Sequence, residues 1–291
     1  MVKLVIGCSG AGNIAKTIAK KANLPYSQLE IKKFPDNELK IRFMKPVKGK
    51  EIILIQSFIG NISEKIIETL FAAYTLKDLG AKKIVLLAPY FSYFRQDTRF
   101  KSGESVSLDI IKKLFRQAPF NKLLIVEPHL HRRKDIKPIF PNGKRIQTAK
   151  VLSEFIKNNI KEDFVLVGPD EESEQWVKPI AKFLKKKHFI LKKKRFTAHH
   201  VKIISKIPKH KEDTAVIIDD ICSTGGTMLQ TIKFLRKEYK KIYSISIHGL
   251  FVNDTLKKLR KQSTVLSTNS IPSPASKIDI TGLLAGIVKN A

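Results

Sequence analysis

The sequence predicts an α/β protein of two similar halves, each a mostly parallel sheet flanked by helices. Short apolar runs alternate with segments of helical spacing along the 291 residues, and strands separated by helices are typical of parallel sheets. The chain also repeats its own layout. Two stretches show the same order of a strand, a loop, a helix, a basic pair and a second strand. They are EIILIQSF…LKDLGAKKIVLLAPYF and TAVIIDDI…LRKEYKKIYSISIHGLF.

The individual elements follow from the periodicity of apolar residues. The expected strands are Leu4–Gly7, Ile52–Gln56, Ile84–Pro89, Leu123–Val126, Val165–Val167, Val216–Asp219 and Ile242–Ile247. The expected helices are Asn13–Ala22, Ser63–Leu79, Ser107–Phe115, Ala149–Asn158, Glu174–Lys186 and Thr227–Tyr239. Turn-forming Pro and Gly residues occur in the stretch 137–146, which predicts the boundary between the two halves.

The chain is unusually basic. It contains 55 Lys and Arg against 26 Asp and Glu, which gives a net charge of +29. A basic surface attracts polyanions such as nucleic acids and phosphorylated metabolites. The charges are spread along the chain, without an RNA-recognition motif, zinc-finger spacing or basic leucine zipper. General solvation is therefore the first interpretation of the charge and anionic substrates the second, and we expect no nucleic acid partner.

The apolar runs argue against a membrane protein, and the cysteines argue against a zinc knuckle and a disulfide scaffold. No run approaches the roughly 18 consecutive apolar residues of a membrane span, and the most apolar one, residues 84–94, is interrupted by Pro89 and Ser92. Cys8 and Cys222 are the two cysteines, and they lack the CxxC spacing of a zinc knuckle. This usage is typical of a reducing compartment. We therefore expect a cytoplasmic protein with no membrane partner and no disulfide scaffold.

Residues 217–227, IIDDICSTGGT, join two adjacent carboxylates to a glycine-rich turn. Ligands of parallel sheets bind beyond the carboxyl ends of the strands, where Asp219 and Asp220 are expected. Carboxylates accept hydrogen bonds from vicinal hydroxyls, and Ser223–Thr227 offer hydroxyls and backbone N–H groups to a phosphate. An ordinary strand before a capped helix accounts for one Asp and one Thr but leaves the second acid and the double glycine unexplained. The pattern predicts a sugar phosphate site.

Two other nucleotide motifs are rejected. GAGNIA at residues 10–15 matches the dinucleotide fingerprint G-x-G-x-x-A, and Glu30 follows roughly twenty residues later, but a lone match is weak and no hydride-transfer residues accompany it. The P-loop pattern G-x-x-x-x-G-K-[ST] is absent from the sequence. ATP would therefore have to bind without a P-loop.

The stretch VIIDDICSTGGTM closely resembles the phosphoribosyl-diphosphate loop shared by phosphoribosyltransferases and ribose-phosphate pyrophosphokinases. Five further stretches resemble pyrophosphokinase motifs in the family's order: FPDNELKIRF (34–43), PYFSYFRQDTRFKSGESVS (89–107), VEPHLHR (126–132), KKKRF (192–196) and IHGLF (247–251). The resemblance covers nearly the whole chain. It implies two phosphoribosyltransferase-like domains, residues 1–145 with the tail 278–291, and residues 146–277.

The resemblance also implies a reaction, the transfer of the diphosphate group of ATP to the anomeric hydroxyl of ribose 5-phosphate, with Mg²⁺ as cofactor and at least a dimer as assembly. Such a step needs positioning, metal and positive charge more than covalent chemistry. The implied ribose 5-phosphate residues are Asp219, Asp220, Ser223, Thr224, Gly225, Gly226 and Thr227. The implied ATP residues are Phe34, Asp36 and Glu38, which come from a neighbouring subunit in the family, and Arg95, Gln96 and Arg99. His129 and Asp170 are the implied metal residues, and Lys193 and Arg195, on a mobile loop, the implied catalytic ones.

Some of these residues have plainer interpretations. By composition, the basic run from Lys185 to Arg195 is typical of a solvated helix end, and only its place among the ordered motifs favours catalysis. The aromatic residues within 90–94 are more typical of a core than of a platform that stacks bases. His131 alternates with His129 along a strand, but the resemblance supports His129 alone. Cys222 lacks a partner base and is interpreted as a spectator.

Several residues depart from the family pattern. Ser223 stands where the family often has an acid, and Glu171 and Glu172 stand where many members have glycines. Asn37 stands where glycine is common, which is acceptable because Asn tolerates a left-handed backbone. Two alternatives stay open: a phosphoribosyltransferase, which would not need Lys193, and a non-catalytic regulatory relative that binds nucleotides or nucleic acid.

Overall fold

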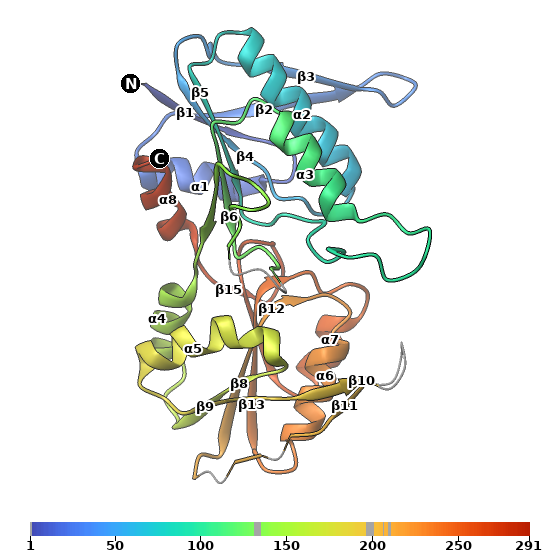
Figure 1. The fold of residues 1–291 in the computed structure, drawn as a ribbon. Coiled ribbons are helices and arrows are strands. Elements are labelled where there is room, and N and C mark those ends of the chain that lie inside the picture. The colour runs from blue at the N-terminus through green and yellow to red at the C-terminus, as the bar shows by residue number, and fades with distance from the viewer. Residues whose placement is uncertain (1, 131–134, 196–200, 206, 209–210) are drawn as a thin grey trace. The chain divides into compact units, whose positions relative to one another are not determined.

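The computed structural model describes residues 2–130, 135–195, 201–205, 207–208 and 211–291. Contacts within the chain separate it into two compact units. Unit 1 comprises Met1–Ile146 and Thr281–Ala291, and unit 2 comprises Gln147–Ile280. Each unit is an α/β structure with a mostly parallel sheet, which confirms the predicted fold class (Figure 1).

Unit 1 contains a seven-stranded sheet with the order β3-β2-β1-β4-β5-β6-β7. Its strands are β1 (Lys3–Gly7), β2 (Tyr26–Lys33), β3 (Leu39–Phe43), β4 (Glu51–Ile55), β5 (Lys83–Ala88), β6 (Lys122–Val126) and β7 (Gly143–Ile146). All neighbours are parallel except β2 and β3, which form an antiparallel hairpin. The central strands are hydrophobic along their length because both faces of the sheet are covered by helices.

The helices of unit 1 are α1 (Gly12–Ala22), α2 (Ile62–Asp78), α3 (Ser107–Gln117) and α8 (Thr281–Lys289). Helices α1 and α8 pack together on one face of the sheet, and α2 and α3 lie side by side on the other (Figure 1). The loop after β5 contributes aromatic rings to the core. Tyr90, Phe91 and Phe94 are buried, and the ring centroid of Phe91 lies 5.0 Å from that of Phe115. The core interpretation of these aromatic residues is confirmed.

Unit 2 contains a six-stranded sheet with the order β15-β14-β13-β12-β8-β9, in which all neighbours are parallel. Its strands are β8 (Phe164–Gly168), β9 (His188–Ile190), β12 (Thr214–Cys222), β13 (Lys241–Gly249), β14 (Thr264–Thr268) and β15 (Ser276–Ile278). Its helices are α4 (Ala149–Asn159), the 3-10 turn η1 (Glu171–Ser173), α5 (Glu174–Leu184), α6 (Gly226–Leu235) and α7 (Thr255–Arg260). A separate antiparallel ribbon joins β10 (Lys193–Arg195) to β11 (Val201–Ile203).

The structure corrects some expected elements. Helix α6 ends at Leu235 rather than Tyr239. Helix α5 ends at Leu184, where Lys185 adopts a left-handed conformation, so the interpretation of Lys185–Arg195 as a helix end is wrong. The hairpin β2–β3 was not among the expected elements, although Leu39, Ile41 and Phe43 alternate with basic residues along β3 as in a half-buried strand.

The loop after β1 is held by polar side chains beneath it. The backbone N–H of Ser9 donates to Glu68 Oε1 at 2.8 Å, and that of Gly10 donates to Gln56 Oε1 at 2.7 Å. Glu68 and Gln56 are buried. A side chain at position 10 has no room, because a Cβ atom would lie 2.0 Å from the carbonyl oxygen of Ser57.

We therefore expect Gly10→Ala to destabilise the protein by roughly 1–3 kcal/mol, since the contact is with backbone that cannot rotate away. Gly286→Ala is the matched control in the same unit, because its Cβ would meet nothing within 4 Å. As a helical glycine replaced by alanine, it should stabilise by about 0.5–1 kcal/mol. Thermal unfolding of both variants measures the difference, and equal midpoints would contradict this account of the loop.

Candidate active site

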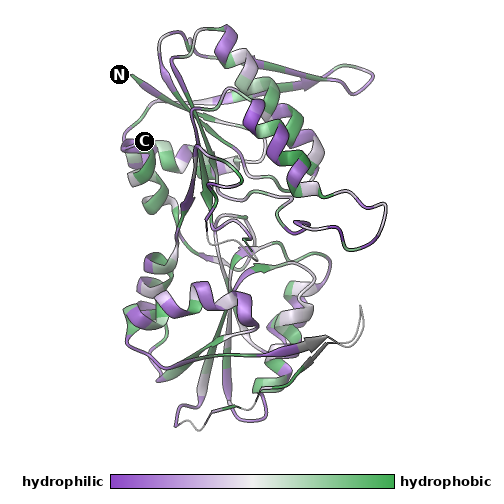
Figure 2. Ribbon diagram, viewed as in Figure 1, coloured by the Kyte–Doolittle hydropathy of each residue, from purple (hydrophilic) through white to green (hydrophobic). Residues whose placement is uncertain are grey.

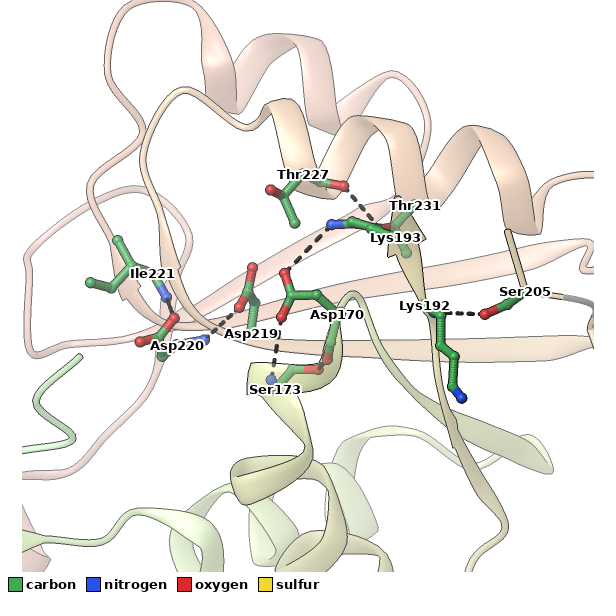
Figure 3. A network of polar contacts seen from close by, with 10 residues as sticks. All are labelled: Asp170, Ser173, Lys192, Lys193, Ser205, Asp219, Asp220, Ile221, Thr227 and Thr231. Atoms are coloured by element: carbon green, nitrogen blue, oxygen red, sulfur yellow. Dashed lines mark hydrogen bonds and ion pairs between the residues drawn. The ribbon is translucent and has the colours of Figure 1, made fainter. Parts of the chain in front are cut away.

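Carboxylates gather at the carboxyl ends of two neighbouring strands of unit 2. Strands β8 and β12 are parallel, with Val167 opposite Ile217. Asp170 follows the end of β8, and Asp219 and Asp220 lie near the end of β12. Figure 3 shows the three carboxylates close together, with the side chain of Lys193 reaching Asp170 from β10. This is the edge of a parallel sheet at which ligands bind.

Asp170 is fixed by the turn that it begins. It caps η1, its Oδ1 atom accepts a hydrogen bond from the backbone N–H of Ser173 at 3.3 Å, and the Ser173 hydroxyl donates back to the Asp170 carbonyl. Gly168 makes room for this turn, because a Cβ there would lie 2.2 Å from Ser173 Oγ. Sequence reasoning missed Ser173, although an Asp followed three residues later by Ser is a recognisable capping pattern.

Lys193 forms an ion pair with Asp170, with 3.5 Å between Nζ and Oδ2. Its side chain is 13% exposed and that of Asp170 is 33% exposed, so the pair is shielded more than a surface salt bridge. Lys193 therefore lies beside the carboxylates, whereas the composition of the basic run favoured lysines that are surrounded by solvent. The position of Arg195 in β10 is described, but its side chain lies outside the described residues.

Asp219 is buried and electrostatically perturbed. Burial raises its pKa well above the ordinary value, and the charges of Asp220 and then Asp170 raise the pKa further, while Lys193 lowers it. Backbone hydrogen bonds offset part of the free-energy cost of ionising these buried carboxylates. Asp219 Oδ1 accepts from the N–H of Asp220 at 3.0 Å, and Asp220 Oδ1 accepts from the N–H of Ile221 at 2.7 Å. The site therefore holds concentrated negative charge that attracts cations and hydroxyl donors.

The turn between β12 and α6 is shaped by glycine. Gly225 has a φ of +75°, and a Cβ at this position would lie 2.6 Å from Thr255 Cγ2, so no other residue fits without strain. The backbone N–H groups of Phe251 and Val252 donate to the carbonyls of Cys222 and Ser223, both at 3.0 Å, and fix the turn from the other side.

The open side of this turn suits an anion. Thr224, Gly226 and Thr227 are exposed, and a Cβ at Gly226 would meet nothing within 4 Å. The first N–H groups of α6 have no acceptor within the helix, and the helix dipole favours negative charge at this end. The predicted residues Asp219, Asp220 and 223–227 thus lie along one continuous strand–turn–helix segment.

Three predicted ATP residues lie at the tip of the hairpin β2–β3 in unit 1. Phe34 is 46% exposed, and Lys40 Nζ lies 5.5 Å from the centroid of its ring. Asp36 accepts a hydrogen bond from the N–H of Glu38 at 3.1 Å, so part of its role is to shape the turn. Asn37 has a φ of +72°, which confirms that it adopts a left-handed conformation.

The other predicted ATP residues follow β5 in unit 1. Arg95 and Arg99 are exposed, and Arg99 Nε donates to the carbonyl of Glu104 at 2.8 Å. Gln96 is half-buried, and its Oε1 atom accepts a hydrogen bond from the Ser107 hydroxyl at the start of α3, at 2.7 Å. The loop therefore presents two guanidinium groups while Gln96 ties it to α3.

The predicted metal residues belong to different units. His129 is half-buried in unit 1, after β6, and Asp170 lies in unit 2. His131 lies outside the described residues. In the described part of the chain, no group of three or more His, Cys, Asp or Glu residues forms a ready metal site, and no helix is both long and apolar enough to cross a membrane.

Comparison with known proteins covers both units. Residues 3–118 match the N-terminal domain of ribose phosphate pyrophosphokinase, and residues 136–284 match the phosphoribosyl transferase domain. The ribose-phosphate pyrophosphokinase of Pyrococcus furiosus is 33% identical over 95% of this chain and 97% of its own. That of Sulfurisphaera tokodaii is 29% identical over 98% and 99%.

A solved structure has the same fold over the full length. The phosphoribosylpyrophosphate synthetase of Mycobacterium smegmatis superposes with a TM-score of 0.86, covers 100% of both chains and is 21% identical. The fold agrees along the whole chain, and the sequence agrees with archaeal relatives over nearly all of it. This chain belongs to the ribose-phosphate pyrophosphokinase family.

Proposed function

We propose that this chain transfers the diphosphate group of ATP to the anomeric hydroxyl of ribose 5-phosphate, giving phosphoribosyl diphosphate and AMP. The observation that carries the proposal is the arrangement in unit 2: two adjacent carboxylates lead into a glycine turn that is open to an anion, with Asp170 and Lys193 beside them. Family membership supports the same reaction.

In this reaction the segment 219–227 binds ribose 5-phosphate. Asp219 and Asp220 accept hydrogen bonds from the ribose hydroxyls, whose protons satisfy carboxylates that otherwise repel each other. The backbone N–H groups and hydroxyls of residues 223–227 bind the 5-phosphate at the start of α6. The two contacts fix both ends of the sugar, which orients its anomeric hydroxyl for attack.

Lys193 supplies positive charge near the reacting groups. The anomeric oxygen attacks the β phosphorus of ATP, and the bond from that phosphorus to the bridging oxygen of AMP breaks. Charge accumulates on that oxygen as AMP leaves, and an ammonium group held in a shielded site stabilises this charge more than it would in water. We assign Arg195, two residues along the same strand, to the same role. Arg95 and Arg99 of unit 1 bind the nucleotide phosphates, Gln96 also contacts the nucleotide, and Phe34, Asp36 and Glu38 contact its adenine.

The carboxylates suit a magnesium ion. Asp170 Oδ2 already has a cationic partner in Lys193 at 3.5 Å, and Mg²⁺ is commonly bound by one or two carboxylates together with substrate phosphates and water. We assign Asp170, and His129 directly or through ATP phosphate, to the metal. When bound, Mg²⁺ neutralises phosphate charge and positions the diphosphate group. A set of three or more protein ligands is not required for this mode of binding.

The assembly and location follow as further parts of the proposal. The adenine residues at the exposed hairpin tip serve a neighbouring subunit, so the protein is at least a homodimer. Cys8 and Cys222 are buried and form no disulfide, which is consistent with the reducing cytoplasm. ATP and ribose 5-phosphate are the small-molecule partners, and neither nucleic acid nor a membrane is needed.

The direct test is incubation of the protein with ATP, ribose 5-phosphate and Mg²⁺, with both products quantified. We expect AMP and phosphoribosyl diphosphate in equal amounts, because a diphosphate group is transferred in one step. ADP in place of AMP would indicate ordinary kinase chemistry and contradict the proposal. ATP binding without turnover would instead favour a regulatory relative.

Lys193→Ala should lower kcat by roughly 10²–10³-fold. ATP affinity should change little, because the ammonium acts mainly on the transition state. The thermal midpoint should fall modestly, because Lys193 also offsets part of the charge of the buried carboxylates. Lys192→Ala is the matched control, since Lys192 is exposed and adjacent. Equal kcat values for the two variants would contradict a catalytic role for Lys193.

Asp219→Asn should abolish turnover yet raise the thermal midpoint by roughly 2–5 °C at pH 7. The fold raises the pKa of Asp219, so the ionised carboxylate costs stability above the pKa of the unfolded chain, and this cost disappears as the pH falls and the folded carboxyl takes up its proton. The difference between variant and wild type should therefore shrink from pH 8 to pH 4. Asp254→Asn, at an exposed carboxylate in the same unit, is the control and should show no such trend.

A further inference from the structure

One oxygen of the Asp170 carboxylate is already engaged by the fold. Asp170 Oδ1 accepts a hydrogen bond from the backbone N–H of Ser173 at 3.3 Å. The Ser173 hydroxyl holds the same turn, because it donates to the Asp170 carbonyl and accepts from the Asp170 N–H at 3.4 Å. Ser173 is buried, so these contacts are shielded from water. The turn therefore orients the carboxylate and leaves Oδ2 to receive a cation.

The second oxygen, Oδ2, has the ammonium of Lys193 as its partner. The distance from Nζ to Oδ2 is 3.5 Å, and Figure 3 shows the lysine side chain reaching Asp170 from β10. A charge-assisted hydrogen bond usually measures about 2.7–2.9 Å. At the longer distance, attraction between the charges holds the ammonium more than a directed hydrogen bond does. Such a partner can be exchanged for a cation that binds the oxygen more closely.

The fold brings the two residues to one place. Strands β8 and β9 are parallel neighbours, with Gly168 opposite Ile190, and the N–H of Leu191 donates to the carbonyl of Gly168 at 2.9 Å. Asp170 and Lys193 follow shortly after these paired residues. Strand β10 consists of basic residues and is hydrophilic in Figure 2, so it has no apolar side chain to anchor it. The ammonium of Lys193 also lies at the end of a flexible four-carbon stem. Lys193 is therefore the movable member of the pair.

The charge around Asp170 favours a stronger cation than an ammonium. Asp219 and Asp220 are buried and lie beside it. Burial raises the pKa of Asp219, and the charges of Asp220 and Asp170 raise it further. The ammonium of Lys193 lowers it. The three carboxyl groups carry more negative charge than this ammonium can offset. A divalent cation has twice the charge, and Mg²⁺ approaches oxygen ligands to about 2.0–2.1 Å.

We propose that a divalent cation displaces the ammonium of Lys193 from Asp170 Oδ2, so that binding of the metal releases Lys193. The two positive charges repel each other, and Oδ1 already has a donor in Ser173. The exchange rests on the proposed function only in taking Mg²⁺ as the ion and the phosphates of ATP as the next partner of Lys193.

The exchange connects two events of the proposed reaction. Mg²⁺ is commonly bound together with substrate phosphates, so the ammonium leaves Asp170 when those phosphates arrive. Lys193 can then turn to the group whose charge it stabilises, because its side chain rotates without movement of β10. Before that moment the same ammonium lowers the electrostatic cost of the carboxylates.

The reactivity of the Lys193 amine tests the exchange directly, in the full chain without ATP or ribose 5-phosphate. Lysines are acetylated with limiting acetic anhydride, and the sites are quantified by mass spectrometry. An amine held in a shielded ion pair reacts slowly. We therefore expect acetylation of Lys193 to rise at least about threefold in saturating MgCl₂, relative to NaCl of equal ionic strength. Lys192, which is adjacent and exposed, is the control and should not change.

Asp170→Asn removes the charged partner of the lysine. In this variant Lys193 should react at the higher rate both with and without Mg²⁺. An effect of Mg²⁺ that persists in Asp170→Asn would place the action of the ion elsewhere and overturn the exchange. A wild type in which Mg²⁺ leaves the reactivity of Lys193 unchanged would also overturn it.

A second measurement follows the ion and decides the question if Asp170→Asn fails to fold. Free Mn²⁺ is quantified by electron paramagnetic resonance. Lys193→Ala removes the competing ammonium and should bind Mn²⁺ roughly three- to tenfold more tightly than wild type, although its kcat falls. Lys192→Ala removes the same charge next to it and should bind as wild type does, which separates exchange from a general loss of positive charge.

Equal affinities of Lys193→Ala and wild type, or a wild type that binds no Mn²⁺, would contradict the exchange. Neither measurement needs the substrates. A protein that shows the exchange but forms no AMP would therefore contradict the proposed function and leave the exchange intact.

Discussion

The site in unit 2 depends on holding carboxylates close together at the end of a buried strand. Asp219 and Asp220 lie in β12, which is parallel to a neighbour on each side, and both are buried. Burial and mutual repulsion make their ionised forms costly, as the raised pKa of Asp219 indicates. The backbone donors of the next residues and the nearby ammonium of Lys193 offset part of this cost. A ligand that supplies hydroxyls or a cation would offset the remaining repulsion between the two carboxylates. Part of the binding free energy would therefore come from relief of that repulsion.

Much of the fold and part of this site could be predicted from the sequence because the relevant signals are local. Strand β12, its terminal acids and the glycine turn are contiguous in the chain, and φ at Gly225 and Asn37 follows from residue type. Parallel pairing then brings Asp170 to the same edge. The core position of Phe91 and Phe94 also follows from their place after a buried strand.

The remaining features depend on contacts between segments that are distant in sequence. In a run of lysines nothing distinguishes Lys193 from its neighbours, and its ion pair exists only because β10 passes the end of β8. The hairpin β2–β3 is a different case, because the alternation of Leu39, Ile41 and Phe43 with basic residues in β3 is a local strand signal that the expected elements left out.

The two halves of the chain also explain why one glycine loop suits the proposed phosphate site and the other does not. Both follow a parallel strand and precede a helix. In unit 1 the N–H groups of Ser9 and Gly10 already donate to the buried side chains of Glu68 and Gln56, and the carboxylate of Glu68 would repel a phosphate. In unit 2 the turn is fixed from behind by residues 251–252, and its front is exposed. The dinucleotide-like motif at residues 10–15 therefore fails on physical grounds, because a glycine-rich turn binds phosphate only where its donors are free and no acid lies beneath them.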